Sequence, residues 1–349
     1  MHIQSYNKYR IIQWYLFLCM IVFYWKKLFH ICLLIYERIY FMAHLLKRLF
    51  SAFICLLFLL SLLPGAFAST VKRDSLGQAY DLSTDYLVTQ YADATGQHGC
   101  FYTIENESSF LIFDGGWAGN ADAVRDVIAA HGNHVSAWII SHPHQDHAGA
   151  FNVIMADPGD IVVDEIYDNG FDYDFIEASG EPYDDLAIME TFHALTKDIS
   201  HVTHLKRGDS LTFCGLTFDV YNAYDDVVLA NVGGEKDYQN NASLLLRIRN
   251  QEDSILFCSD IKYDMNAFLS ANLTPEMLSS TYVQLGHHGN WSLDEDFYAR
   301  TGAGVFFLDA PSNISDNPDF PASTLKADLL AQNKTVLDYS TAPHSVVLK

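Results

Sequence analysis

The stretch that decides the fold is SHPHQDHAGA, residues 141–150, which directly follows the apolar residues WII at 138–140. Imidazole nitrogens and carboxylate oxygens are the ligands that Zn²⁺ and related metals prefer. We expect these side chains in a loop after a strand, where chemistry is common, with Gly149 permitting a tight turn. The pattern predicts a metal site, and a solvated histidine-rich turn is the alternative. Four potential ligands lie within six residues: His142, His144, Asp146 and His147.

Strand-like and helix-like segments alternate around this stretch. Asn120 is a candidate helix cap and Gly132 a helix stop. The grouping of hairpins, with helices between the groups, predicts one domain built as a mixed-sheet sandwich flanked by helices. We expect hairpins at 100–116, 210–223 and 242–260, single strands at 135–141, 281–286, 335–340 and 345–349, and helices at 120–132, 184–198 and 320–334.

Charge divides the chain into a basic N-terminal part and an acidic remainder. Of the 21 Lys/Arg and 43 Asp/Glu residues, seven basic residues and one acid, Glu37, lie in the first 68 positions. This leaves 14 basic and 42 acidic residues downstream, a net charge of −28. Nucleic-acid binding draws its affinity from Lys and Arg at the phosphates, so nucleic acid is an unfavourable partner. A small or cationic substrate suits this charge better.

Residues 42–68 carry the pattern of an export signal. A positive start at Lys47 and Arg48 leads into an apolar run, which ends in the small residues AFAS at 66–69. This pattern predicts a signal peptide that is cleaved after Ala68. A retained membrane anchor is the alternative.

The apolar residues 1–41 are either a membrane segment or an upstream extension, and we favour Met42 as the start. The folded domain is then expected at 69–349. We expect the protein to be secreted or to lie on the extracellular membrane face.

These motifs resemble those of the metallo-β-lactamase superfamily. HPHQDH at 142–147 matches its signature HxHxDH, and FLIFDGG at 110–116 matches the strand and turn that precede it. LFCSD at 256–260 is similar to the later strand that ends in a metal-bridging aspartate, and VQLGHHGN at 283–290 to the last histidine motif. The resemblance spans roughly 97–349 and implies an α/β fold, the αββα four-layer sandwich of that superfamily.

Within the superfamily, the pattern is most similar to the ComEC-type branch, named for the competence protein. NNAS at 240–243, HHG at 287–289 and the hairpin sequence at 204–223 resemble that branch. Many superfamily members take a third ligand of the first ion from a GHT-type motif, and that motif has no counterpart between 148 and 259. The histidines in this interval fall on a helix and before a hairpin, so we expect structural roles for them: His193, His201 and His204.

The resemblance implies a site for two divalent ions, with zinc favoured over manganese and iron. Asp260 would bridge the ions. By analogy His287 is a ligand and His288 faces the substrate, although the reverse assignment stays open. The implied ligands are His142, His144 and Asp260 for the first ion, and Asp146, His147, Asp260 and His287 for the second.

Such a site implies an exported metal-dependent hydrolase that activates water for attack on a phosphodiester or another small ester, without an organic cofactor. Asp146 and His288 are the expected catalytic residues: Asp146 would orient the water, and His288 would donate a proton or hold the developing oxyanion. A lactonase or thioesterase, a ComEC-like nuclease and a non-catalytic binding module are the alternatives. The expected partner is a small-molecule or cell-surface ester, with membrane association through the N-terminal part.

An insert after the histidine cluster, residues 164–185, interleaves aromatic residues with acids. Aromatic faces beside carboxylates can hold a quaternary ammonium group. Because phosphorylcholine esterases of bacterial surfaces are members of the superfamily, teichoic-acid phosphorylcholine is one candidate substrate. The alternative, which we favour, is an acidic surface loop whose aromatic side chains pack on the core: Tyr167, Phe171, Tyr173, Phe175 and Tyr183.

Overall fold

The chain divides into two units, which are described one by one. The computed structural model divides the chain into Met1–Thr70 and Val71–Lys349. In the first unit, the helix Tyr24–Phe50 is long and apolar enough to cross a membrane, a test that signal sequences also pass. The cleavage site of the expected signal peptide and residues 51–63 of its apolar centre lie outside the described residues. The structure describes residues 18, 20–21, 24–28, 30–42, 44–50, 71–175, 185–232, 237–339 and 343–349.

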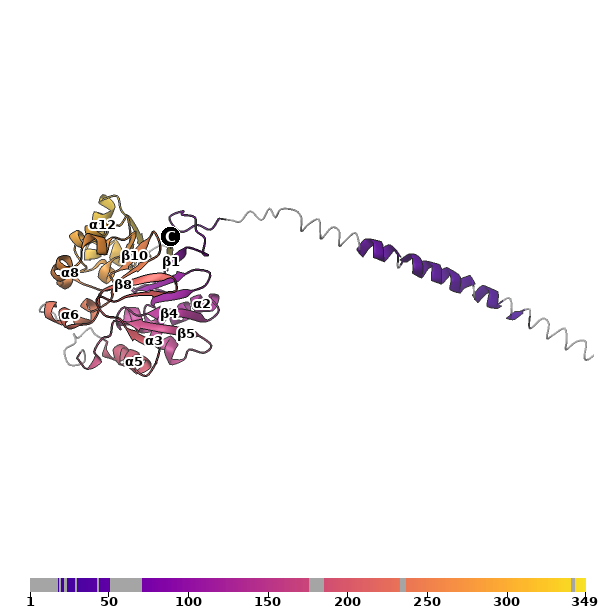
Figure 1. Cartoon of the computed structure of the whole chain (residues 1–349), viewed down its shortest axis with the longest axis horizontal. Coiled ribbons are helices and arrows are strands. Elements are labelled where there is room, and N and C mark those ends of the chain that lie inside the picture. The colour runs from indigo at the N-terminus through magenta and orange to yellow at the C-terminus, as the bar shows by residue number, and fades with distance from the viewer. Residues whose placement is uncertain are drawn as a thin grey trace, which may run out of the picture. The chain divides into compact units, whose positions relative to one another are not determined.

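Seven strands form the first mixed sheet, in the order β14-β1-β2-β3-β4-β5-β6. Figure 1 labels β1, β4 and β5 of this sheet. In this order, neighbouring strands from β14 to β3 pair antiparallel, and neighbouring strands from β3 to β6 pair parallel. The β2–β3 hairpin is confirmed, and Asn106 closes its turn by accepting hydrogen bonds from the backbone of Ser108 and Ser109. The strands are β1 Tyr86–Gln90, β2 Phe101–Glu105, β3 Phe110–Asp114, β4 His134–Ile139, β5 Val162–Asp168, β6 Val202–His204 and β14 His344–Leu348.

The second sheet repeats this plan in the order β13-β12-β11-β10-β9-β8-β7. Pairs from β7 to β10 are antiparallel, and pairs from β10 to β13 are parallel. Both expected hairpins form, and the β7–β8 turn places Cys214 and Gly215 at positive φ. The strands are β7 Ser210–Phe213, β8 Leu216–Asn222, β9 Leu245–Arg249, β10 Ser254–Phe257, β11 Tyr282–Gln284, β12 Val305–Leu308 and β13 Thr335–Asp338.

Three apolar clusters hold four layers together. The central cluster joins the inner faces of both sheets, where Phe113 of one sheet stacks on Phe257 of the other at 4.1 Å between ring centroids. A second cluster packs α2 Ala121–Ala130, α3 Gln145–Ala156 and α5 Leu186–Thr196 on the outer face of the first sheet. The third covers the second sheet, so the fold is the predicted αββα sandwich. Its helices include α8 Asn266–Asn272, α9 Pro275–Leu278, α10 Glu295–Thr301, α11 Ser312–Ser315 and α12 Pro321–Ala331.

Short elements complete the part of the fold near the site. They are α6 Asp226–Asn231 and α7 Tyr238–Asn241, with single 3-10 turns η1 Ala118–Asn120, η2 Tyr263–Met265 and η3 Gly286–Gly289.

Two details of the local prediction are wrong. Asn120 precedes α2 but does not cap it, because its carboxamide oxygen accepts the Ala94 N–H at 2.7 Å instead. Gly149 lies inside α3 rather than at a turn. A Cβ at Gly149 would lie 2.4 Å from the Ala118 nitrogen and 2.8 Å from the Trp117 carbonyl carbon, so this glycine permits close approach of η1.

Candidate metal centre

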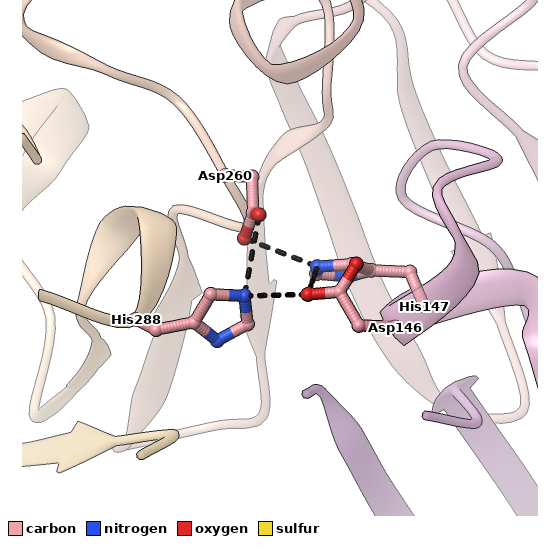
Figure 2. A group of neighbouring side chains, drawn as sticks. All are labelled: Asp146, His147, Asp260 and His288. Carbon is pink, nitrogen blue, oxygen red and sulfur yellow. Dashed lines mark ion pairs between the residues drawn. The ribbon is translucent and has the colours of Figure 1, made fainter. Parts of the chain in front are cut away.

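The histidine-rich stretch and two later motifs meet where strands of both sheets end. His142 follows β4, Asp260 follows β10, and His288 lies in η3 just after β11. Figure 2 shows Asp146 and His147 pointing from the start of α3 toward Asp260 and His288 on the other side of the site. The expectation that these two residues lie in a loop is therefore wrong, since they occupy the first turn of a helix.

Four side chains form the centre of the site: Asp146, His147, Asp260 and His288. The Nε2 atom of His147 lies 3.1 Å from Asp260 Oδ1. The Nε2 atom of His288 lies 3.0 Å from Asp146 Oδ2 and 3.3 Å from Asp260 Oδ2. All four residues are buried, so each charge here is removed from bulk water.

Outer contacts fix which imidazole nitrogen faces this centre. Asp114, at the end of β3, accepts a hydrogen bond from His147 Nδ1 at 2.7 Å. The backbone carbonyl of Asp309 accepts one from His288 Nδ1 at 3.1 Å. Both Nε2 atoms thereby face inward. Metal-binding histidines commonly have such partners, which hold the ring and the tautomer.

The inward-facing atoms fit a bound cation. His147 Nε2, Asp260 Oδ1 and His288 Nε2 are buried, and none has a hydrogen-bond partner among the described residues, although they lie close together. Buried polar atoms in native proteins are nearly always satisfied, so these atoms need an explanation. Two imidazole nitrogens and two carboxylates are a donor set that suits zinc and also iron or manganese.

The charges of the groups at the centre also fit a bound cation. Burial opposes charge on every group, but the attraction between them prevails. The pKa of Asp260 falls well below its ordinary value because of His147 and His288. The Asp260 and Asp146 carboxylates raise the pKa of His288 to about 10 despite its burial. Any divalent cation that binds here must displace protons from these imidazoles.

The two histidines of the HHG motif occupy different positions relative to the central group. His288, expected to face substrate, joins the central group, whereas His287, expected to be a ligand, lies outside it. His287 Nδ1 donates to the Asn290 carbonyl at 2.5 Å, and its Nε2 accepts from Asn240 Nδ2 at 3.4 Å. Both histidines have left-handed backbone conformations, with φ of 46° and 52°, which a sequence pattern does not reveal.

His142 and His144 form a neighbouring group beside the centre. Their ring centroids are 4.7 Å apart, and the His142 ring lies 4.2 Å from that of His147. His142 is fully buried, and its Nε2 lies 3.2 Å from the carboxamide oxygen of Asn240. Of the expected first-ion residues, His142 and His144 are thus adjacent to the four-residue centre, and Asp260 is part of it.

The histidines expected to be structural are engaged elsewhere or lie outside the centre. His204 Nδ1 contacts Asp168 Oδ1 at 2.6 Å, and His193 stacks on Tyr173 with ring centroids 5.7 Å apart. His201 lies just before β6, outside the central group.

The sequence pattern missed two polar residues, His98 and Asn240. His98 lies before β2, with its Nε2 3.5 Å from Asp146 Oδ2 and its ring 4.7 Å from that of His288. Burial, with a further contribution from His288, lowers the pKa of His98 to about 4, so the ring is neutral at pH 7. Asn240 is the first residue of the NNAS motif, but nothing in that motif indicates that it faces His142.

A cavity of about 160 Å³ opens onto this centre. Its wall is rich in carboxylates and imidazoles: His98, His144, Gln145, Asp146, Asp185, Asn240, Asp260, His287 and His288. A larger cavity of about 600 Å³ includes Gly289 and Trp291, which follow the HHG pair in the chain. Trp291 is 54% exposed, and its ring lies 6.2 Å from that of His287, which lines the smaller cavity.

Comparison with known proteins supports the superfamily. Residues 98–192, which include the histidine-rich stretch, match the family model described as the metallo-beta-lactamase superfamily. That superfamily binds divalent metals and consists mostly of hydrolases. The comparison with curated proteins finds no match.

Several solved structures are similar to this chain. The metallo-beta-lactamase fold protein YhfI from Bacillus subtilis has 15% identity and a TM-score of 0.46, over 76% of this chain and 99% of that one. The metallo hydrolase Igni18 from Ignicoccus hospitalis has 11% identity and a TM-score of 0.44, over 76% and 99%. CmlA, a diiron beta-hydroxylase from Streptomyces venezuelae, has 12% identity and a TM-score of 0.46, over 76% of this chain and 54% of CmlA.

Proposed function

We propose that this protein is an exported metal-dependent hydrolase that uses two divalent ions to cleave a phosphodiester or another small ester. The observation that carries the proposal is the set of buried inward-facing atoms at His147, Asp260 and His288, for which the described part of the chain offers no hydrogen-bond partner. Zinc is the favoured metal, with manganese and iron as alternatives. In this account Asp146, His147, Asp260 and His288 hold one ion, and His142, His144 and Asp260 lie toward the other.

Divalent ions at such a site lower the pKa of water into the neutral range and offset negative charge that develops on the substrate. Asp146 has one oxygen 3.0 Å from His288, and this carboxylate can also orient an attacking water in the cavity. The substrate-facing role expected of His288 passes to His98. His98 is neutral, lines the cavity and can donate an N–H to a developing oxyanion.

Charge around the site favours a small or cationic substrate. Asp146, Asp185 and Asp260 line the smaller cavity, and metal ions would offset only part of their charge. The larger cavity presents Trp291 beside the carboxylates of Asp294, Glu295, Asp319 and Asp328. Aromatic faces beside carboxylates favour organic cations. A ComEC-like nuclease remains the alternative on motif resemblance, but this acidic surface would repel a polyanion.

The aromatic insert gives less support to a phosphorylcholine substrate. Tyr167 packs into the core between the sheets, and Phe171 packs against the outer cluster of the first sheet, 6.1 Å from Phe192. Phe175 contacts the Tyr224 and Tyr238 rings. The positions of these three residues agree with the favoured alternative, in which the aromatic side chains of the insert pack on the core. Tyr183 lies outside the described residues.

The proposal of export rests on the N-terminal part of the chain. The helix Tyr24–Phe50 supports a signal sequence or an anchor, and the AFAS sequence at 66–69 supports cleavage. Secretion, or exposure on the extracellular face of the membrane, would bring the domain 69–349 to cell-surface esters.

Hydrolysis of bis-p-nitrophenyl phosphate by the purified full chain tests the proposal. We expect turnover that is lost on chelation, restored by Zn²⁺ or Mn²⁺, and absent in His147→Ala. His193→Ala is the matched control, because His193 lies on α5 outside the central group. Turnover of lactones or thioesters alone would move the protein to the alternative hydrolase classes. Metal binding without turnover on any ester would favour a binding module.

A further inference from the structure

Asn240 and His142 form a contact between two buried polar side chains. Both side chains are buried, with 4% and 0% exposure, and Asn240 Oδ1 lies 3.2 Å from His142 Nε2. Asn240 comes from α7, whereas His142 follows β4 of the other half of the sandwich. The contact therefore depends on the tertiary fold, and its nature depends on where the protons are.

The orientation of the Asn240 carboxamide follows from its other contacts. Its Nδ2 donates to Asp237 Oδ2 at 3.0 Å, and a carboxylate can only accept. The same Nδ2 lies 3.4 Å from His287 Nε2, which is an acceptor because His287 Nδ1 donates to the Asn290 carbonyl. Both amide protons are thereby assigned, and the oxygen must face His142.

The protonation of His142 follows from a chain of contacts behind it. Ser141 Oγ has one proton, and Asp114 Oδ2 lies 2.8 Å away, closer than His142 Nδ1 at 3.1 Å. The hydroxyl therefore donates to the Asp114 carboxylate, the stronger acceptor. Its oxygen is left to accept from His142 Nδ1, so the proton of the neutral His142 ring lies on Nδ1.

Two lone pairs, on His142 Nε2 and Asn240 Oδ1, thus face each other at 3.2 Å with no proton between them. Such a pair is repulsive unless a cation lies between the two atoms. Ligand atoms bound tetrahedrally at about 2.1 Å from one zinc ion are themselves separated by about 3.4 Å, close to this distance. His144, whose ring lies 4.7 Å from that of His142, lines the same cavity as Asn240.

We propose that Asn240 Oδ1 is a metal ligand that acts with His142 and His144 on the first ion, in the place of the missing third histidine. The inference rests on the proposed function only in assuming that the protein binds divalent metal. An amide oxygen is a neutral donor and a weaker one than imidazole for zinc. The first ion is therefore the more weakly bound of the two.

Asp237 and Lys262 are positioning residues for this ligand. Lys262 Nζ lies 2.7 Å from Asp237 Oδ2, the same oxygen that accepts from Asn240 Nδ2. The Asp237 and Lys262 side chains are only 1% and 8% exposed, so the ion pair is held within the domain. Because Lys262 comes two residues after Asp260, the pair links Asn240 to the segment that carries Asp260.

Zinc stoichiometry of the purified full chain, kept in mild detergent, tests the inference without an activity assay. The protein is saturated with Zn²⁺, dialysed against metal-free buffer and analysed for bound zinc, and the binding affinity is measured by calorimetry. We expect two ions in the wild type and one in Asn240→Ala. Asp237→Asn should weaken the first ion about 10- to 100-fold, as loss of a partner behind a ligand does.

Asn152→Ala is the matched control, because Asn152 is a buried asparagine of α3 whose amide donates to the Ile188 carbonyl. It should keep both ions. Equal melting temperatures of Asn240→Ala and Asn152→Ala in chelator would exclude general loss of structure as the cause.

Two ions in Asn240→Ala would overturn the inference and leave the proposed function standing. One ion in both the wild type and Asn240→Ala would also overturn it, and would mean that His142 donates a simple hydrogen bond to Asn240. No zinc in the wild type would overturn the proposed function and this inference together.

Discussion

Replacement of Lys262 by methionine should destabilise the domain strongly. Methionine keeps most of the packing volume and removes the charge, so Asp237 is left as a buried, unpaired carboxylate. Breaking a buried ion pair from one side costs about 3–5 kcal/mol. Asp237 keeps two hydrogen bonds, from the Asn240 backbone N–H at 3.2 Å and from its side-chain amide at 3.0 Å. These bonds place the expected loss near the lower end, at about 3 kcal/mol.

The loss should also depend on pH, with a definite sign. In the wild type, burial raises the pKa of Asp237 but Lys262 outweighs it, so the pKa is lowered. Its contribution to stability is present above the unfolded-state value of about 3.9 and is lost as the pH falls through the lower folded value. In Lys262→Met, burial is no longer opposed by Lys262, and the folded pKa rises. The penalty is then greatest near pH 7 and decreases as the carboxyl becomes protonated.

Urea denaturation of the full chain in chelator, followed by circular dichroism between pH 4 and 7, measures both effects. The double variant Asp237→Asn/Lys262→Met should recover most of the lost free energy, because no buried charge remains. Arg249→Met is the matched control: Arg249 and Asp219 form a half-exposed pair, 38% and 16% exposed, whose loss costs at most about 1 kcal/mol. A Lys262→Met loss no larger than that of Arg249→Met, or one that grows as the pH falls, would refute the reasoning.

Three further predictions follow from the site and its supports. His98→Ala should lower kcat about 100- to 1,000-fold with unchanged zinc content, because it removes an oxyanion donor and no ligand; loss of zinc would instead make His98 a ligand. Free Zn²⁺ at about 100 times its Kd should stabilise the folded chain by about 2.7 kcal/mol and raise the melting temperature by about 5–10 °C in calorimetry, and no shift would argue against a preformed site. Gly149→Ala should destabilise the domain although alanine favours helices, because its Cβ would lie 2.4 Å from the Ala118 nitrogen. Gly304→Ala is the control in the same thermal melt, because its Cβ would meet no atom within 4 Å. Equal melting temperatures of the two variants would show that η1 can move aside.

Much of the fold could be predicted because its signals are local. The β2–β3 hairpin follows from two apolar runs around Asn106, whose side chain closes the turn. The start of α3 is different, because HPHQDH is polar and contains a proline, a composition typical of a loop. The helix nevertheless begins at Gln145, and this places Asp146 and His147 in its first turn. The polar ligand residues thus made the first turn of this helix look like a loop in the sequence.

The arrangement of the site could be predicted only in part. Asp146 and His147 can be identified from the HxHxDH pattern, and Asp260 from its position after an apolar strand. The choice between His287 and His288 depends on two successive left-handed residues, which no local composition signals. Asn240 was missed because its relation to His142 spans 98 residues and exists only once both sheets are packed.

The most direct test of the metal centre is the zinc content of the full chain after dialysis, compared between His288→Ala and His287→Ala. The two histidines are neighbours, so the pair controls for local disturbance of η3. We predict that His288→Ala loses the ion held with Asp146, His147 and Asp260, and that His287→Ala retains it. Retention by His288→Ala with loss in His287→Ala, or no zinc in the unaltered protein, would contradict the account.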